Sequence, residues 1–149
     1  MKKPRILLAD DYPAMLTALC GLLDGMGEVV GRVRDGRALV EEAQRLEPDI
    51  IIADISMPMM NGLEATRALQ AVVPQSKVII LTGHRELAYV TLAFHMGARG
   101  YLLKNTSLHA ELSQALLHVT AGDCYIGLGV REEWAPADGA ESSTWRADL

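Results

Sequence analysis

Two short apolar runs of the chain end in aspartate, and these aspartates are the first candidates for chemistry. Residues 50–53 are followed by Asp54, and residues 5–9 are followed by Asp10 and Asp11. Carboxylates held close together repel one another and need a cation, and hard oxygen ligands of this kind suit Mg2+ or Mn2+. An Asp-Asp pair after a strand is also common as a helix cap with a solvated neighbour, so the pair alone predicts no site.

Two further apolar runs end in a hydroxyl group and an ammonium group. Residues 77–81 lead to Thr82, and residues 100–103 lead to Lys104. An aspartate such as Asp54 can carry a phosphoryl group as an acyl phosphate, and a metal ion, a lysine and a hydroxyl group can stabilise the phosphoryl oxygens. The four run ends together therefore favour a phosphoryl-accepting site over a solvated pair of aspartates.

The four apolar runs are expected to be strands. They are short and rich in aliphatic or β-branched residues, which is typical of strands buried on both faces of a parallel sheet. Residues 29–33 predict one more strand. Because ligands of parallel sheets bind beyond the carboxyl ends of the strands, we expect the four run ends to meet in one crevice.

Apolar residues at helical spacing fill the segments between and after these strands. The alternation predicts an α/β fold, a flavodoxin-like doubly wound parallel sheet of five strands in which a strand–helix unit occurs five times. The expected buried helix faces are Leu16, Leu19, Cys20 and Leu23; Leu39, Ala43 and Leu46; Ala65, Leu69 and Val72; Leu87, Val90, Thr91 and Phe94; and Leu108, Leu112, Ala115, Leu116 and Val119.

Length and charge limit the classes of protein to consider. The 149 residues carry a formal net charge of -5, which suits one domain and gives no electrostatic footprint for nucleic acid or an anionic membrane. We expect this domain over residues 1–122, followed by a tail or the start of a linker over 123–149. No signal peptide or membrane-length run is recognisable, so a cytoplasmic location is expected. Cys20 and Cys124 lack metal-ligand spacing and are expected to be buried reduced thiols.

The residue set as a whole resembles the receiver domain of bacterial two-component response regulators. The resemblance covers about residues 4–121 and rests on Asp10-Asp11, on Asp54 followed by Ile55-Ser56-Met57-Pro58 and Gly62, on Thr82, and on Tyr101 with Lys104. Within that family, residues 61–67 and 97–104 are similar to the NarL/FixJ (LuxR-type) subfamily.

The resemblance implies that Asp54 accepts a phosphoryl group from a phosphohistidine of a sensor histidine kinase. The receiver itself would catalyse this transfer and a later, slow hydrolysis. The cofactor would be Mg2+ (or Mn2+), bound by Asp11 directly, by Asp10 mainly through water, by Asp54, and by the backbone carbonyl of Ser56. Lys104 would supply a fixed positive charge beside the phosphoryl group.

The resemblance also implies a switch next to this site. Thr82 would move toward the phosphoryl oxygens, and Tyr101 would turn inward behind it as the switch aromatic. An ordinary half-buried strand tyrosine is the alternative, although the place of Tyr101 three residues before Lys104 favours the switch. Ser56 and His84 occupy positions that in this family tune the access of water to the phosphoryl group, and plain solvent exposure is the alternative for His84.

These features predict the receiver of a NarL/LuxR-type transcriptional regulator. The expected partners are a sensor histidine kinase and a second copy of the chain, bound through the fourth and fifth helices and the strand between them, with no membrane. The sequence up to Leu149 leaves no room for a helix-turn-helix, so DNA binding is expected only through an output domain absent from this sequence. Asn105 follows Lys104 where most receivers have proline, which predicts a different exit loop.

Three alternatives are kept beside this prediction. The first is a stand-alone receiver that acts through protein contacts without binding DNA. The second is an interaction module that works without phosphorylation, although the complete set of polar run ends argues against it. The third is a metal-dependent phosphohydrolase of the haloacid dehalogenase kind, which places an Asp-x-Asp pattern after its first strand, whereas Asp10 and Asp11 are adjacent here.

Overall fold

The computed structural model describes residues 2–105, 107–130 and 144–145, with strands and helices in alternation. The first half contains β1 Arg5–Ala9, α1 Pro13–Leu22, β2 Glu28–Val33, α2 Gly36–Leu46, β3 Ile50–Ala53 and α3 Gly62–Val72. The second half contains β4 Lys77–Thr82, α4 Leu87–His95, β5 Gly100–Leu103, α5 Leu108–Thr120, β6 Cys124–Ile126 and β7 Thr144–Trp145. Among the described residues, no helix is long and apolar enough to cross a membrane.

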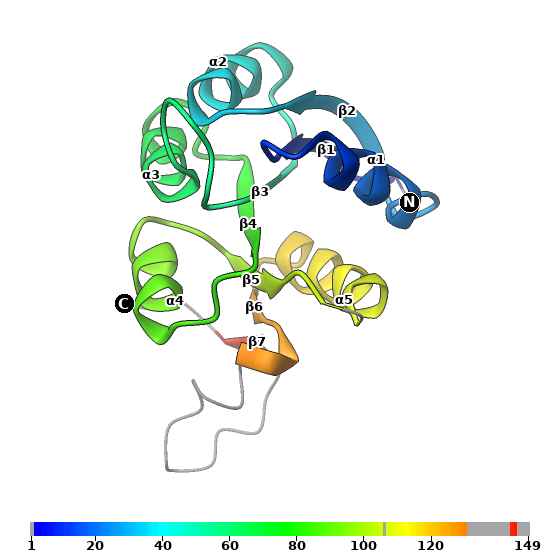
Figure 1. Ribbon diagram of the computed structural model, residues 1–149. Coiled ribbons are helices and arrows are strands. Elements are labelled where there is room, and N and C mark those ends of the chain that lie inside the picture. The colour runs from blue at the N-terminus through cyan, green and yellow to red at the C-terminus, as the bar shows by residue number, and fades with distance from the viewer. Residues whose placement is uncertain (1, 106, 131–143, 146–149) are drawn as a thin grey trace.

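One sheet runs through the middle of the molecule, with helices on both faces. The strand order is β2-β1-β3-β4-β5-β6-β7; neighbours from β2 to β6 are parallel, and β7 is antiparallel to β6. Helices α1 and α5 cover one face, and α2, α3 and α4 cover the other (Figure 1). This arrangement confirms the doubly wound α/β fold.

Strand β3 shows why the sheet is stable. All four of its residues are buried, and they alternate between the two cores: Ile51 packs on the side of α2, α3 and α4, whereas Ile50 and Ile52 pack on the side of α1 and α5. Burying an isoleucine side chain stabilises a fold by about 1.5–3 kcal/mol relative to exposure. A strand that fills both cores is therefore held rigidly, and the residue that follows it is held with it.

The helix starts near the carboxyl edge of the sheet are encoded locally. Pro13 occupies the first turn of α1, and the Asp35 carboxylate accepts a hydrogen bond from the Ala38 backbone N–H (2.7 Å) at the start of α2. Helix α3 begins with a capping box, in which Asn61 and Glu64 each satisfy a backbone N–H of the other. These caps fix the points at which the chain leaves the loops after β1, β2 and β3.

The prediction of five strands is wrong, because β6 and β7 extend the sheet beyond β5. Strand β6 pairs in parallel with β5, with Tyr125 opposite Gly100 and Ile126 opposite Tyr101. Regular structure therefore continues past Gly122, into the segment expected to be a tail. A strand of three residues is too short to show an alternating pattern, so only its pairing with β5 reveals it.

Three residues that were expected on buried helix faces are exposed in the structure. Val72 and Leu87 are exposed, as is Thr91. At the end of α3 it is Val73 that is buried, and α4 turns Ala93 inward instead. The two cysteines are free thiols; the expectation of burial is confirmed for Cys124, whereas Cys20 is only half-buried.

Candidate functional site

The four polar run ends come together because their strands are neighbours. Strands β1, β3, β4 and β5 are consecutive in the sheet and parallel. Asp10 and Asp11 follow β1, Asp54 follows β3, Thr82 ends β4 and Lys104 follows β5. All of them therefore lie at the carboxyl edge of the sheet, as the sequence predicts.

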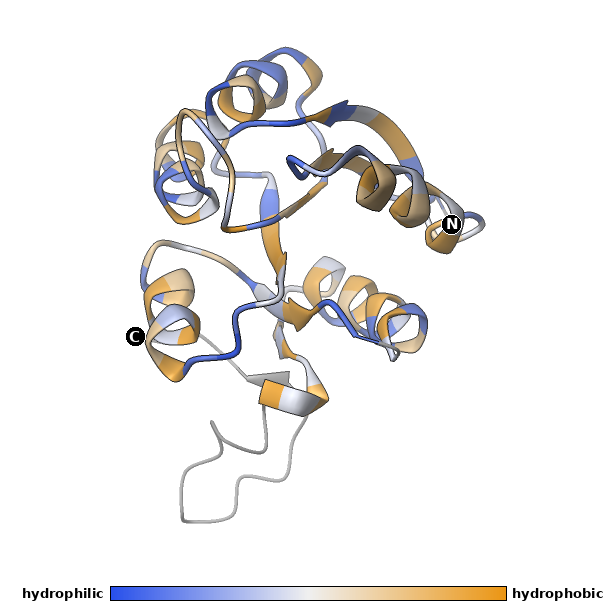
Figure 2. Ribbon diagram, in the orientation of Figure 1, coloured by the Kyte–Doolittle hydropathy of each residue, from blue (hydrophilic) through white to orange (hydrophobic). Residues whose placement is uncertain are grey.

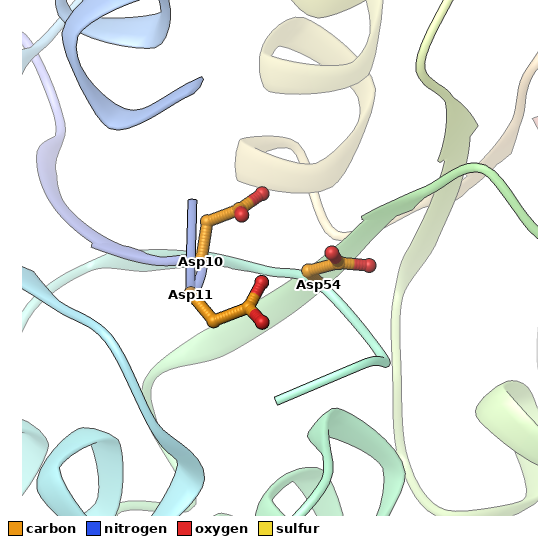
Figure 3. Close-up of side chains that lie close together, drawn as sticks. All are labelled: Asp10, Asp11 and Asp54. Carbon is orange, nitrogen blue, oxygen red and sulfur yellow. The ribbon is translucent and has the colours of Figure 1, made fainter. Parts of the chain in front are cut away.

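Three carboxylates form an acidic cluster at this edge. Asp10, Asp11 and Asp54 each offer an oxygen, and these oxygens all lie within 4.8 Å of one another (Figure 3). Asp10 and Asp54 are buried, whereas Asp11 is exposed. Hard oxygen donors with one side open to water are what Mg2+ takes in proteins, since this ion keeps several water ligands. The residues present therefore fit a divalent cation held by Asp11, Asp10 and Asp54.

The ammonium group of Lys104 joins the two buried carboxylates. Its Nζ lies 2.7 Å from Oδ2 of Asp10 and 2.9 Å from Oδ2 of Asp54. Burial lowers the pKa of Lys104, but its hydrogen bonds to the two carboxylates outweigh this, so the pKa is raised above the ordinary value. A permanent positive charge is thus placed directly beside Asp54.

The remaining oxygens of the buried carboxylates are held by the backbone. Oδ1 of Asp54 accepts a hydrogen bond from the Ile55 N–H (2.7 Å), and Oδ1 of Asp10 accepts one from the Tyr12 N–H (2.9 Å). Each buried carboxylate therefore has one oxygen on a backbone amide and the other on Lys104. This double attachment removes rotational freedom from both side chains before any ligand binds.

Side chains of the loops after β3 and β4 contact each other near the site. Oγ of Ser56 lies 2.9 Å from Nε2 of His84, and the His84 ring packs against Tyr89 with 4.6 Å between ring centres. The hydroxyl of Thr82, which is buried, accepts a hydrogen bond from the His84 N–H (3.4 Å). His84 is half-buried, and its ring contacts both Ser56 and Tyr89.

Tyr101 lies fully inside the protein, beneath the same loop. Its side chain has 0% exposure, and its hydroxyl donates a hydrogen bond to the carbonyl oxygen of His84 (2.6 Å). Burial, followed by the charges of Glu86 and Asp54, raises the pKa of the Tyr101 phenol well above its ordinary value, so the hydroxyl stays a donor. Tyr101 is therefore fully buried rather than half-buried, and its ring is turned inward in this structure.

Two contributors to the site were not anticipated. The Ile55 N–H orients Asp54 although its side chain carries no polar group, and Tyr89 contacts the ring of His84. A backbone donor leaves no signal in the sequence. Tyr89 could have been suspected, because it lies in the first turn of α4, three residues after the hydrophilic loop between β4 and α4 ends at Glu86 (Figure 2).

Comparison with known proteins agrees with this geometry. A family model described as the response regulator receiver domain matches residues 6–116. The response regulator GacA of Pseudomonas viridiflava is 36% identical over 134 residues, which cover 88% of this chain and 62% of GacA. The chain thus spans less than two thirds of the length of this curated relative.

Two solved structures share both fold and sequence with the chain. A two-component response regulator of the LuxR family from Aurantimonas has a TM-score of 0.85 and 30% identity, over 90% of this chain and 96% of that one. The signal receiver domain of NarL from Mycobacterium tuberculosis has a TM-score of 0.77 and 31% identity, over 82% of this chain and 99% of that one. The chain belongs to the response regulator receiver family and is homologous to the NarL/LuxR-type regulators within it.

Proposed function

We propose that Asp54 is the phosphoacceptor of this receiver and that its phosphorylation by a sensor histidine kinase is the input of a NarL/LuxR-type transcriptional regulator in the cytoplasm. The bridge that Lys104 forms between Asp10 and Asp54, 2.7 Å and 2.9 Å from their oxygens, is the observation that supports this most directly. It holds a nucleophilic carboxylate and a cation at the place where phosphoryl charge would develop.

The chemistry is a displacement at phosphorus. A carboxylate oxygen of Asp54 forms a bond to phosphorus while the bond from phosphorus to the imidazole nitrogen of the donor breaks, and the donor histidine leaves. Asp10, Asp11, Asp54 and the Ser56 carbonyl would hold Mg2+, which would supply positive charge to the phosphoryl oxygens. Lys104 supplies a second fixed charge, and the Thr82 hydroxyl supplies a hydrogen bond.

The test of this proposal uses acetyl phosphate as a small phosphodonor with Mg2+. We expect the intact protein to gain the mass of one phosphoryl group and Asp54→Ala to gain none. Asp49→Ala is a matched control, because Asp49 lies at the other end of β3 and binds the Arg5 backbone. Equal labelling of wild type and Asp54→Ala would contradict the assignment of Asp54. Continuous release of phosphate from unrelated phosphate esters would favour the phosphohydrolase alternative.

Ser56 and His84 are proposed to set the lifetime of the phosphorylated state. Their side chains meet at 2.9 Å, from the loops after β3 and β4, and this contact would reduce the access of water to Asp54. We expect His84→Ala to accelerate dephosphorylation several-fold while leaving the rate of phosphorylation by acetyl phosphate unchanged. Decay of the phosphorylated mass with time measures the rate, with His95→Ala, an exposed residue in the last turn of α4, as the control. Identical decay of His84→Ala and wild type would remove this role.

Self-association is proposed to involve α4 and α5 and to change on phosphorylation. Exposed apolar side chains lie on both helices, including Leu92 and Leu117. Strand β5 does not contribute a free edge, because β6 pairs with it. We expect the sedimentation coefficient to change when beryllofluoride and Mg2+ are added to wild type, and to stay constant in Asp54→Ala. An unchanged coefficient for wild type would count against this dimer.

A further inference from the structure

A buried carboxylate on α5 holds the chain that follows this helix. Glu111 is 6% exposed, and both of its oxygens accept hydrogen bonds from residues beyond α5. Oε1 accepts from the Tyr125 hydroxyl (2.5 Å), and Oε2 accepts from the Leu128 N–H (2.8 Å). A buried carboxylate is costly unless it is hydrogen-bonded, so these two bonds give the segment a defined position.

The segment 124–130 is closely fitted to β5 and α5. The Gly127 N–H donates to the carbonyl oxygen of Tyr101 (2.8 Å), and a side chain at Gly127 would lie only 2.7 Å from Oε2 of Glu111. The Tyr125 ring stacks on His118 of α5, with 5.5 Å between ring centres. Buried Ile126 and Val130 join the same core as Tyr101. We call residues 124–130 the docking segment.

Tyr101 connects the docking segment to the phosphoryl site. Its carbonyl oxygen accepts from Gly127, and its hydroxyl donates to the carbonyl oxygen of His84, whose ring reaches Ser56 beside Asp54. Contiguous contacts alone do not prove coupling, because coupling also requires an element with two positions that both sites bias. The switch role that the family resemblance implies for Tyr101 would make this residue that element.

We propose that attachment of the docking segment to β5 is coupled through Tyr101 to the state of Asp54, with Glu111 as the positioning residue that holds the segment in place. This inference rests on the proposed function and extends it to the path by which the chain leaves the receiver. The structure pairs an inward Tyr101 with an attached segment. If a phosphoryl group on Asp54 favours the inward tyrosine, as the switch role implies, it strengthens the attachment, and by thermodynamic reciprocity the attachment strengthens phosphoryl binding by the same factor.

Amide hydrogen exchange on the intact chain tests whether a phosphoryl analogue at Asp54 strengthens the attachment of the docking segment. With saturating beryllofluoride and Mg2+, we expect the Gly127 and Leu128 amides of wild type to exchange about fivefold more slowly, a typical size for coupling between sites. If beryllofluoride binds and both amides exchange at unchanged or faster rates, the coupling does not exist. If beryllofluoride fails to bind at all, the proposed function itself is overturned, and this inference falls with it.

Substitutions in the docking segment and at Glu111 test whether the attachment strengthens binding at Asp54. We expect Tyr125→Phe and Glu111→Gln to weaken the affinity for beryllofluoride by about the same factor of five. Tyr125→Phe keeps the ring that stacks on His118 and is the milder change, so it serves where Glu111→Gln folds poorly. Glu41→Gln, on the exposed face of α2, is the matched control and should bind as wild type does. A merely structural role of Glu111 would lower the free energy of unfolding and leave this affinity unchanged, which would overturn the proposal.

Discussion

Replacing Lys104 with methionine is expected to slow phosphorylation of Asp54 by about 100-fold, as removal of a single stabilising donor from an active site does. The same substitution is expected to lower the free energy of unfolding at pH 7 by about 2–3 kcal/mol, since it leaves two buried carboxylates without their cation. The ammonium lies 2.7 Å and 2.9 Å from Asp10 and Asp54, while methionine keeps the length of the side chain. The expected loss of unfolding free energy is smaller than that for a fully buried ion pair, because the Lys104 side chain is 26% exposed.

The pH dependence of this loss follows from the sign of the pKa shift. The pKa of Lys104 is higher in the folded protein than its ordinary value in the unfolded chain. Its contribution to stability is therefore complete below that value and disappears as the pH rises through the folded pKa. We expect the difference in unfolding free energy between wild type and Lys104→Met to be constant near neutral pH and to shrink in the alkaline range.

Lys77→Met is the matched control for both measurements. Lys77 begins β4 at the opposite edge of the sheet, and its Nζ donates a hydrogen bond to the Val119 carbonyl (3.2 Å). Lys77→Met is expected to leave the rate of Asp54 phosphorylation by acetyl phosphate unchanged. Denaturant titration followed by circular dichroism gives the stability of each variant, and intact mass gives the phosphorylation rate. Equal phosphorylation rates for Lys104→Met and Lys77→Met would contradict the role proposed for Lys104.

The parts of the fold that the sequence predicts are those with strong local patterns. Strands β1, β3, β4 and β5 are continuous apolar runs, and each run ends in a polar residue. Because these strands are parallel neighbours, the position at which each run ends predicts that Asp10, Asp54 and Lys104 lie at one edge of the sheet. The acidic cluster and its lysine therefore required no information about tertiary contacts.

The parts that the sequence does not predict depend on contacts between distant residues. Strand β6 has only three residues and is stabilised by β5 and by Glu111 rather than by its own pattern. The contact of Ser56 with His84 joins loops 28 residues apart. Glu111 carried a usable signal, because Leu108 and Ala115 lie one turn before and after it on the buried face of α5, and a charged residue within that face needs a partner.

Gly62→Ala is expected to destabilise the protein by about 3 kcal/mol, at the upper end for overpacking, because main-chain atoms surround the site of the new methyl group. A Cβ at Gly62 would lie 2.0 Å from the carbonyl oxygen of Asp54 and 3.0 Å from Cα of Ile55. No rotation of a side chain can relieve this contact. The backbone between Asp54 and Ile55 must therefore move, and it is the Ile55 N–H of this backbone that orients the carboxylate.

The same displacement is expected to reduce phosphorylation in the Gly62→Ala protein that remains folded. A misplacement of about 1 Å in a reacting group can lower a rate by about 100-fold. Gly21→Ala is the matched control: no atom lies within 4 Å of its new Cβ, and alanine in α1 should stabilise the protein by about 0.5–1 kcal/mol. Rates per folded molecule separate the two effects, since stability alone changes only the folded fraction. If Gly62→Ala is phosphorylated at the rate of Gly21→Ala, the loop after β3 does not need its present position for the reaction.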